Sequence, residues 1–504
     1  MRKLLYFFLL LSFVGFGFEW DFENDRPKVS WWALHGQKKQ HSIEFATNPQ
    51  TGKQALLAKW DGDLSTWMHV YSGNMQGLDE FKCAKFTFKL ATSETSKLRA
   101  VTLRIQDKDL ETFYFRRRVR WKQAGRWTVE YIVDPANLAY TSSGKHGKIA
   151  NGKLDFPLHG FGVTLEVPSE SGRGEVFIEN MKYVELDEVP PPPELWTLER
   201  LDKELLANPP ARTDYMVRSE ILDEMDRILS VPKSEDDPKI ADFYNMRIMR
   251  AIEEIKQWDS PKAKLWKFYS SGVAIKYGGK VIAFDINDGV ILGRDHKVRR
   301  KLELYPETVD ALADVIDEMY YTHEHCDHVG RRVSNALFDK GKTIYACAAT
   351  IKYWGWEGKP GLIVAEKHQA KGYHCYDSFQ WMSETFKVQN VCYVLELGPK
   401  LTVMARGDMY KKEDIDGFIA WIKERKLHID VALLNTQWSI IGPCKENWDS
   451  FFIPLHEWEF THRRYGTGGA ATQSYAIVMN TYGTLIDAGK CEILAWGEGT
   501  LLTD

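Results

Sequence analysis

The residues with the clearest chemical potential in this sequence lie in one short segment, residues 322–330, which reads Thr-His-Glu-His-Cys-Asp-His-Val-Gly. It places four ligand-type side chains within six residues: His323, His325, Asp327 and His328. Imidazole and carboxylate groups suit zinc and similar divalent ions. Two histidines at i and i+2 in extended backbone point the same way and can hold one ion. Asp327 and His328 follow a turn and can reach a second ion.

A strand precedes this segment, because residues 316–321 read as a buried strand that would deliver the ligands at its C-terminal end. Ligand sites in α/β folds favour that end. A lone histidine is usually structural. Three histidines and an aspartate at this spacing, directly after a strand, instead indicate a metal site.

Metal-assisted hydrolysis is the chemistry that follows from these ligands. A divalent ion lowers the pKa of bound water toward neutrality and polarises the oxygen under attack. Asp327 could orient that water and accept its proton, which makes Asp327 the predicted catalytic residue. The ligands do not choose between an ester, lactone, amide, phosphoester or sulfate ester. A Gly-rich phosphate loop, which would indicate a nucleotide substrate, does not accompany the segment.

Residues 264–500 resemble the metallo-β-lactamase-fold hydrolase superfamily, whose signature HxHxDH matches residues 323–328. Further segments match in order. Residues 281–285 are similar to an early strand that ends in a structural aspartate, and residues 401–408 to the strand that carries a metal-bridging aspartate. Residues 451–456 are similar to the last strand, which ends in a histidine ligand of the second metal.

This resemblance implies a centre of one or two divalent ions, with zinc expected and manganese or iron as alternatives. The implied ligands are His323, His325, Asp327, His328, Asp408 and His456. The implied fold is an αβ/βα metallo-β-lactamase-like sandwich over residues 264–504, which agrees with the alternation of strand and helix patterns there.

One ligand of the family pattern is missing from this sequence. The family usually has another histidine shortly before the strand that here covers residues 391–397, and residues 381–390 contain none. His368 and His374 lie upstream, and Glu384 offers a carboxylate oxygen, so three substitutes remain open. Without a substitute, the first ion would be held weakly or only one ion would remain.

The rest of the chain divides at four consecutive prolines, residues 190–193, which form a stiff spacer. Residues 190–263 are predicted to be a Pro-rich linker and short helical connector, because apolar residues recur at helical spacing over residues 221–229. Before the prolines, residues 18–189 alternate apolar and polar side chains at period two, which predicts an all-β jelly-roll sandwich.

The front sandwich resembles the galactose-binding-like jelly rolls that are appended to polysaccharide-active enzymes. Residues 20–23, 126–130 and 174–180 carry this resemblance. It implies a carbohydrate-binding domain. Basic residues stand beside aromatic residues over residues 113–122, which favours either an anionic saccharide or a half-exposed strand with solvated arginines.

Tryptophan is abundant, with 18 residues, and each of these rings either fills a core or offers a flat face to a ligand. Trp31 and Trp32 are adjacent in a strand and therefore point to opposite faces. Arg463 and Arg464 follow the last ligand and could bind an anionic group with fork geometry, or they could be solvated surface arginines. The predicted substrate contacts are Arg463, Arg464, Trp458, Trp381, Trp31 and Trp32.

The N-terminus reads as an export signal over residues 1–17, with a basic start, an apolar stretch and small residues at a cleavage site. A periplasmic or secreted protein is therefore expected, with no membrane segment after cleavage. Export permits disulfides, but the seven cysteines show no paired spacing and are predicted mainly to be buried. A disulfide among them remains open, and the sequence does not indicate an oligomeric state.

The leading hypothesis is an exported metal-dependent hydrolase that acts on a small-molecule or glycan substrate. The alternative is a non-enzymatic glycan-binding or scaffold protein with a degenerate metallo-β-lactamase fold, which the missing histidine favours. A metallo-nuclease is a weaker third option, because the net charge of −4 gives no reason to expect a nucleic acid partner.

Overall fold

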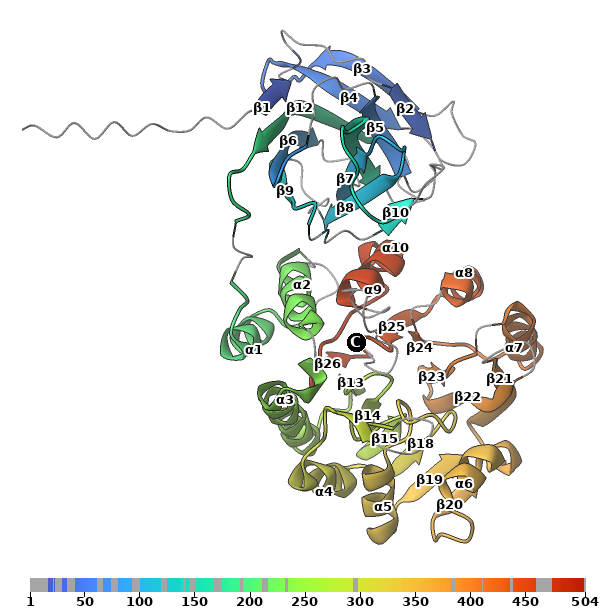
Figure 1. Cartoon of the computed structure of the whole chain (residues 1–504). Coiled ribbons are helices and arrows are strands. Elements are labelled where there is room, and N and C mark those ends of the chain that lie inside the picture. Colours follow the sequence, from blue (N-terminus) through green and yellow to red (C-terminus); the bar gives the residue numbers. More distant parts are fainter. Residues whose placement is uncertain are drawn as a thin grey trace, which may run out of the picture. The chain divides into compact units, whose positions relative to one another are not determined.

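The chain forms two compact units, Met1–Pro193 and Glu194–Asp504, in the computed structural model (Figure 1). The structure describes residues 17–20, 22, 30–33, 41–60, 67–73, 80–92, 100–118, 125–136, 138, 142–144, 151–166, 174–190, 194–210, 216–231, 234–292, 298–381, 386–409, 411–435, 438–458 and 474–502. Each unit has its own apolar core.

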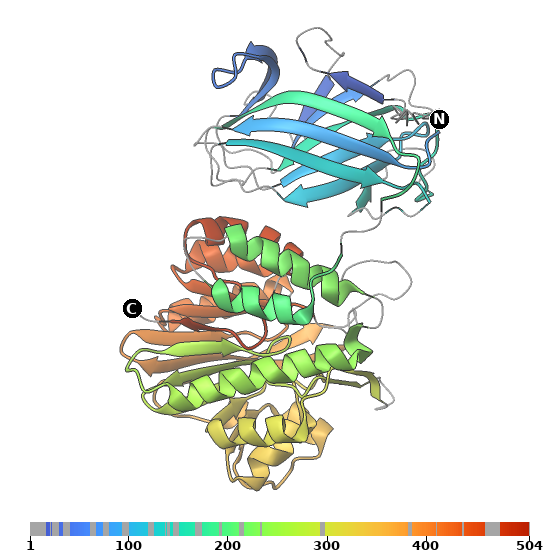
Figure 2. The ribbon, with the colours of Figure 1, turned by 90° about the vertical axis from the view of Figure 1, so that its left-hand side faces the viewer.

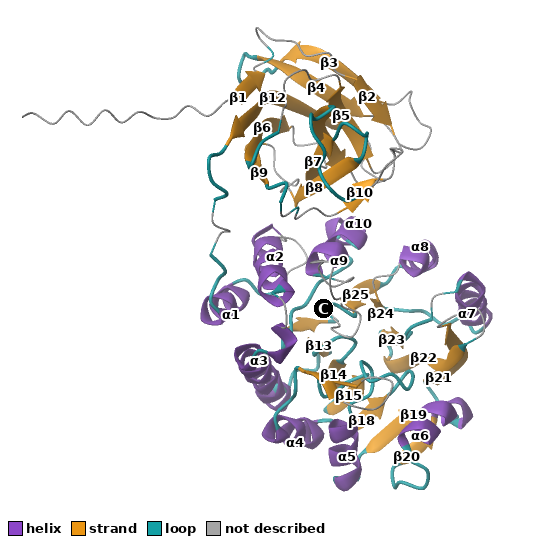
Figure 3. Cartoon of the chain, viewed as in Figure 1, coloured by secondary structure: helices purple, strands orange, loops and turns teal. Residues whose placement is uncertain are grey.

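The first unit is a sandwich of two antiparallel sheets, which confirms the predicted all-β front domain (Figure 3). Its first sheet has the described order β3-β4-β12-β6-β9, with β1 paired to β12. These strands are β1 (Gly17–Trp20), β3 (His41–Thr47), β4 (Gln54–Trp60), β6 (Ala84–Thr92), β9 (Gly125–Val133) and β12 (Gly174–Glu185). The second sheet has the order β10-β8-β7-β11-β5-β2. Its strands are β2 (Ser30–Ala33), β5 (Trp67–Gly73), β7 (Ala100–Gln106), β8 (Thr112–Arg118), β10 (Ser142–Gly144) and β11 (Gly160–Glu166).

The period-two pattern explains the core of this sandwich. Phe86 and Phe88 of β6 are fully buried in it, whereas Lys89, the next residue along the strand, is exposed. Trp60 also belongs to this core and is not a stacking platform. A Cβ atom at Gly174 would lie 2.1 Å from the Trp60 ring, so β12 approaches β4 closely enough to require a glycine there.

The helical stretch that we expected to be a connector belongs to the second unit. It contains α1 (Leu198–Ala207), α2 (Met216–Ser230), the short 3₁₀ helix η2 (Ser234–Asp236) and α3 (Pro238–Gln257). Leu201, Leu222 and Ile248 from these helices share one apolar core with Trp266 of the first strand that follows. The boundary between the units therefore falls at residue 193, and the helices are part of the fold that carries the predicted metal ligands.

Two main sheets form the centre of the second unit. The described order in one sheet is β20-β19-β18-β15-β14-β13-β26, and in the other β21-β22-β23-β24-β25, with the pair β16-β17 apart. The first contains β13 (Lys264–Lys267), β14 (Val273–Tyr277), β15 (Lys280–Phe284), β18 (Glu318–Tyr320), β19 (Thr343–Ala346), β20 (Leu362–Val364) and β26 (Gly499–Leu501). The second contains β21 (Tyr373–Trp381), β22 (Lys387–Gly398), β23 (Leu401–Ala405), β24 (Val431–Asn435) and β25 (Phe451–Leu455). The pair is β16 (Val290–Leu292) with β17 (Val298–Lys301).

Helices cover the outer faces of both sheets, so the unit has the predicted αβ/βα layers (Figures 1 and 2). The remaining described helices are α4 (Pro306–Val315), α5 (Arg331–Asp339), α6 (Ala348–Trp354), η3 (Ala365–Lys367), α7 (Lys412–Glu424), α8 (Trp438–Asn447), α9 (Tyr475–Thr481) and α10 (Gly483–Asp487). Strand β23 shows how alternation builds the layers. Val403 and Ala405 pack between the sheets, while Met404 packs outward in the core that the helices share.

The strands that matter for function end at one edge. Strands β15 and β18 pair in parallel, as do β23 with β24 and β24 with β25, so their carboxyl ends point the same way within each sheet. Asp285, Asp408 and His456 directly follow β15, β23 and β25 or lie within three residues of their ends. The predicted strand over residues 316–321 is shorter than expected, covering Glu318–Tyr320, and delivers the 322–330 segment to the same place.

The predictions about export concern regions that the structure describes only in part. Residues 1–16 of the expected signal lie outside the described residues. In the part of the chain that is described, no helix is long and apolar enough to cross a bilayer. All seven cysteines are described and remain thiols, and five of them are buried, as predicted.

Candidate metal centre

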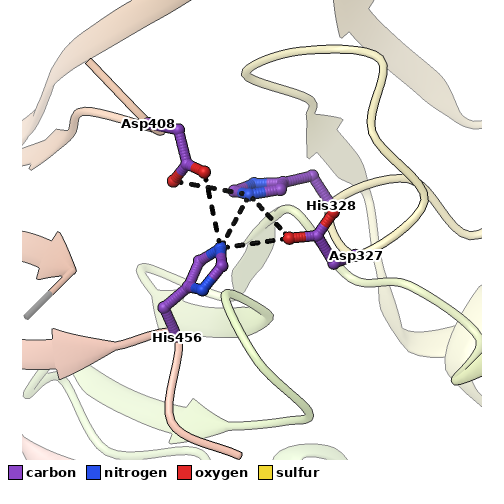
Figure 4. A group of neighbouring side chains, drawn as sticks. All are labelled: Asp327, His328, Asp408 and His456. Atoms are coloured by element: carbon purple, nitrogen blue, oxygen red, sulfur yellow. Dashed lines mark hydrogen bonds and ion pairs between the residues drawn. The ribbon is translucent and has the colours of Figure 1, made fainter. Parts of the chain in front are cut away.

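Four of the predicted ligands converge in the second unit. Ligand-type atoms of Asp327, His328, Asp408 and His456 all lie within 4.8 Å of one another, and all four residues are buried (Figure 4). His456 Nε2 is 3.2 Å from His328 Nε2 and 3.1 Å from Asp327 Oδ2. The Asp408 oxygens lie 3.6 Å from each imidazole Nε2.

This donor set fits a first-row divalent ion. Two ligands at about 2.0–2.1 Å from a tetrahedral ion are separated by about 3.3 Å, close to the spacing of the two imidazole nitrogens. Burial alone would raise the pKa of Asp408, but the imidazoles of His456 and His328 hold that pKa well below its usual value. Ionised carboxylates buried together need a compensating cation.

The chain reaches this arrangement through tight backbone turns. The amide of His328 donates to the carbonyl of His325 at 3.0 Å, so the segment turns directly after β18. Gly407 precedes Asp408 with a φ of +66°. A Cβ atom there would lie 2.2 Å from Asn390 Oδ1 and 2.7 Å from Thr322 Cβ, so only glycine allows β23 to approach the 322–330 segment.

Asp285 orients His328, as the predicted structural aspartate. Its Oδ2 lies 2.8 Å from His328 Nδ1, and its two oxygens also accept the amide and the hydroxyl of Thr322 at 2.8 and 2.7 Å. A carboxylate on Nδ1 fixes the tautomer and leaves Nε2 to face the cluster. Burial lowers the pKa of His328, but the carboxylates of Asp285, Asp408 and Asp327 outweigh it and hold the pKa well above its usual value.

Asp408 is held at both carboxylate oxygens by amides that the sequence analysis missed. Gln380 Nε2 donates to Oδ2 at 2.9 Å, and Asn435 Nδ2 donates to Oδ1 at 3.2 Å. Arg406 in turn donates to Asn435 Oδ1 at 2.7 Å, which fixes the orientation of that amide. Asn435 is the last residue of β24 and Gln380 the next to last of β21. Their position at the ends of strands is the feature of the sequence that could have indicated a role in the centre.

A buried ion pair supports His456. Lys267 Nζ lies 3.1 Å from Glu457 Oε2, with side chains only 2% and 1% exposed. Lys267 also donates to the carbonyl of Ser270, and that carbonyl accepts the His456 amide at 3.2 Å. Burial lowers the pKa of Lys267 and raises that of Glu457, while each attracts the other toward its charged form. The pair ties the loop after β25 to β13.

His323 and His325 lie beside the four-residue cluster and not within it. The His323 ring centroid is 4.0 Å from that of His328 and 4.6 Å from that of His325. His323 is fully buried, and its Nδ1 is 3.1 Å from the Thr322 hydroxyl. Burial, followed by the neighbouring His328 and His325, holds the pKa of His323 well below its usual value, so its imidazole is neutral and able to act as a ligand.

Neither upstream histidine replaces the missing ligand. His368 packs edge-on against the ring of Tyr373, with centroids 4.7 Å apart. His374 Nε2 lies 3.0 Å from Glu396 on a partly exposed strand. Both are engaged away from the cluster, so these two substitutes are wrong. Glu384 lies outside the described residues.

Two of the predicted substrate contacts are wrong. Trp458 is fully buried, and its indole donates to Asp226 at 2.5 Å, so no substrate can stack on it. Trp381 follows Gln380 in β21 and therefore points to the opposite face of the sheet. Its indole donates to Asp414 of α7 at 2.9 Å, and the Lys411 ammonium lies 3.4 Å from its ring centre.

The other predicted contacts stay predictions. Strand β2 pairs Trp31 with Val70 and Trp32 with His69, but the side chains of both tryptophans lie outside what is described. Arg463 and Arg464 fall in residues 459–473, which are also outside the described residues.

Similarity to known proteins is found among solved structures. No protein-family model and no curated protein matches the chain. A possible metal-dependent hydrolase from Veillonella parvula is similar at 12% identity and a TM-score of 0.36, over 48% of this chain and 99% of that chain. An isothiocyanate hydrolase from Delia radicum gut bacteria is similar at 15% identity and a TM-score of 0.37, over 48% and 100%.

The further similarity is to a carbohydrate-binding module. A family 11 module from Clostridium thermocellum, solved with a β-1,3-1,4-mixed-linked tetrasaccharide, is similar at 13% identity and a TM-score of 0.26, over 34% of this chain and 98% of that chain.

Proposed function

We propose that this protein is a metal-dependent hydrolase whose centre is held by Asp327, His328, Asp408 and His456. The observation that carries the proposal is the convergence of these four buried side chains from three separate segments of the chain. In a degenerate scaffold we would not expect two carboxylates and two imidazoles to remain oriented toward one point. We would also not expect Asp285 to remain in place to fix the His328 tautomer.

Each residue of the centre has a distinct task in this proposal. A divalent ion bound here would acidify a water molecule and polarise the substrate oxygen under attack. His328 and His456 offer their Nε2 atoms, and Asp408 offers oxygens whose directions Gln380 and Asn435 fix. Asp327 faces His456 at 3.1 Å and is placed to orient the attacking water and accept its proton.

Metal analysis coupled to a hydrolysis screen on the purified protein tests this function. We expect at least one divalent ion per chain and turnover in an ester, lactone, phosphoester or sulfate-ester panel. Asp327→Ala should lose both metal and turnover. His374→Ala is the matched control, because this histidine of the same unit pairs with Glu396 away from the centre. Bound metal without turnover on any panel would favour the non-enzymatic alternative.

We further propose that zinc is the ion and that the front sandwich engages a glycan. Adjacent positions Trp31 and Trp32 on β2 are the proposed sugar contacts. Affinity electrophoresis on soluble polysaccharides should show retardation that Trp32→Ala or Trp31→Ala weakens. Ile132→Ala, an exposed apolar residue on the other sheet, serves as the control. Equal retardation in all variants would exclude these contacts.

Export is the remaining part of the proposal, and it rests on the residues 1–17 pattern. Cell fractionation of the full chain should find the mature protein outside the cytoplasm. A chain that lacks residues 2–14 should stay inside. Cytoplasmic accumulation of both forms would contradict export.

A further inference from the structure

Among the described residues near the centre, His323 Nε2 and Gln380 Oε1 are two of the buried polar atoms that have no hydrogen-bond partner. His323 is fully buried and Gln380 is 7% exposed. Buried polar atoms are nearly always satisfied, so each exception requires an explanation. Both belong to side chains that touch the four-residue cluster, His323 through the His328 ring and Gln380 through Asp408.

We propose that Gln380, through its amide oxygen, joins His323 and His325 in holding a second divalent ion next to the first. This inference rests on the proposed function, because it concerns the composition of the same centre. Asp408 links Gln380 to the first position, since Gln380 donates to its Oδ2 and its two oxygens lie 3.6 Å from the imidazoles of His328 and His456.

The orientation of the Gln380 amide supports this role. Its Nε2 donates to Asp408 at 2.9 Å, and a carboxylate accepts hydrogen bonds but cannot donate one, so the nitrogen must face Asp408. The amide oxygen is then held at the centre with a free lone pair. Trp381, the next residue, points to the other face, so Gln380 is the residue at the end of β21 that faces the ligands.

Few other described residues could supply a further ligand to the second ion position. One group of histidine, cysteine or acidic side chains among the described residues could hold an ion. It consists of Asp327, His328, Asp408 and His456. No carboxylate or thiol of the described chain therefore joins His323 and His325 in a second group of this kind. Glu384, outside the described residues, is the competing donor and becomes an outcome of the test.

An amide oxygen makes the second position weaker than the first. It is neutral and harder than imidazole, and oxygen ligands favour ions such as Mn²⁺. The first position combines two imidazoles with two carboxylates. The protein should therefore bind one ion tightly and a second ion more weakly. The ratio of Mn²⁺ affinity to Zn²⁺ affinity should be higher at the weaker position than at the tight one.

Calorimetric titration of the chelator-stripped full chain with Mn²⁺ and with Zn²⁺ tests the inference. We expect two classes of site in the wild-type protein. Gln380→Leu should weaken the second class by about tenfold or more, and it should weaken the first class less, because Asn435 still holds Asp408 there. Gln380→His should strengthen the second class, because imidazole replaces the amide. Gln389→Leu is the matched control, since this glutamine of the paired strand contacts Asp377 and Ala349.

Three results would overturn the proposal. One is a single class of site in the wild-type protein at saturating metal, which would leave Gln380 only as a support for Asp408. Another is an unchanged second class in both Gln380→Leu and Gln380→His, with circular dichroism showing that they fold. The third is loss of the second class in Glu384→Ala with none in Gln380→Leu. Failure of the proposed function is distinct, because it appears as an empty first class or as absent hydrolysis.

Discussion

The two sides of the metal centre differ in how completely the chain builds them. On one side, Asp327, His328, Asp408 and His456 come from three segments and meet within 4.8 Å. On the other, His323 and His325 stand next to this cluster, and the Gln380 amide contacts it through Asp408. No further described acid or imidazole forms a ligand group with these two histidines.

Support from neighbouring residues follows the same division. His328 is fixed by Asp285, Asp408 by Gln380 and Asn435, and the His456 loop by the Lys267–Glu457 pair. His323 has one hydroxyl contact, to Thr322. A ligand whose partners hold it in place loses little freedom when the ion binds. The two sides should therefore differ in their affinity for a divalent ion.

The largest expected effect comes from removing a ligand on the complete side. His456→Ala should lose the tightly bound ion and reduce hydrolysis to background, whereas His323→Ala should keep that ion and lose only the weaker one. Metal content after gel filtration distinguishes the two variants. Equal metal loss in both would show that the two sides form one indivisible site.

Breaking the buried ion pair should cost the next largest amount. Lys267→Met leaves Glu457 buried without its ammonium partner, which should lower the free energy of unfolding by about 3–5 kcal/mol. Chemical denaturation measures this change. The double variant Lys267→Met/Glu457→Leu should recover most of the loss, because it leaves no unpaired charge. No recovery would mean that the pair matters through something other than its charge.

Asp285→Asn should weaken the complete side selectively. The amide cannot fix the His328 tautomer as a carboxylate does, so affinity for the tight ion should fall by about 10–100-fold. The weaker position should be unchanged, which competition with a chelator can measure. The control is Asp317→Asn, because this aspartate of the same unit pairs with Lys342. A similar fall at both positions would erase the distinction between the sides.

The stability that each ion adds should also differ between the two sides. At a free concentration 100 times its Kd, the tight ion should stabilise the fold by about 2.7 kcal/mol, and a weak ion at its own Kd by about 0.4 kcal/mol. Thermal unfolding at increasing metal concentration should therefore show one large and one small increase in Tm. The chelated protein should stay folded, because its two apolar cores do not include the centre.

Much of the site could be predicted from the sequence because its ligands follow local rules. His323, His325, Asp327 and His328 are close in the chain, and Asp285, Asp408 and His456 each follow a strand in the expected order. The front sandwich was equally accessible, since alternation at period two is itself the condition for a half-buried strand.

Other features depended on which elements become neighbours. Trp458 and Trp381 were expected near a substrate, but their surroundings are Asp226 and Asp414, which lie 232 and 33 residues away in the chain. Helices α1 to α3 were predicted to be a connector. The sequence shows their apolar faces, but it does not show that the second unit covers those faces.

The sequence by itself determined the type of chemistry, the two-part organisation and most of the ligands, because residue type and spacing along one chain suffice for these. Tertiary structure alone decided that Gln380 and Asn435 hold Asp408, and that Lys267 and Glu457 hold the loop of His456. A glutamine or a lysine has no fixed role in a sequence. Its role is set when folding buries it beside a particular charge and removes the water that would otherwise satisfy it.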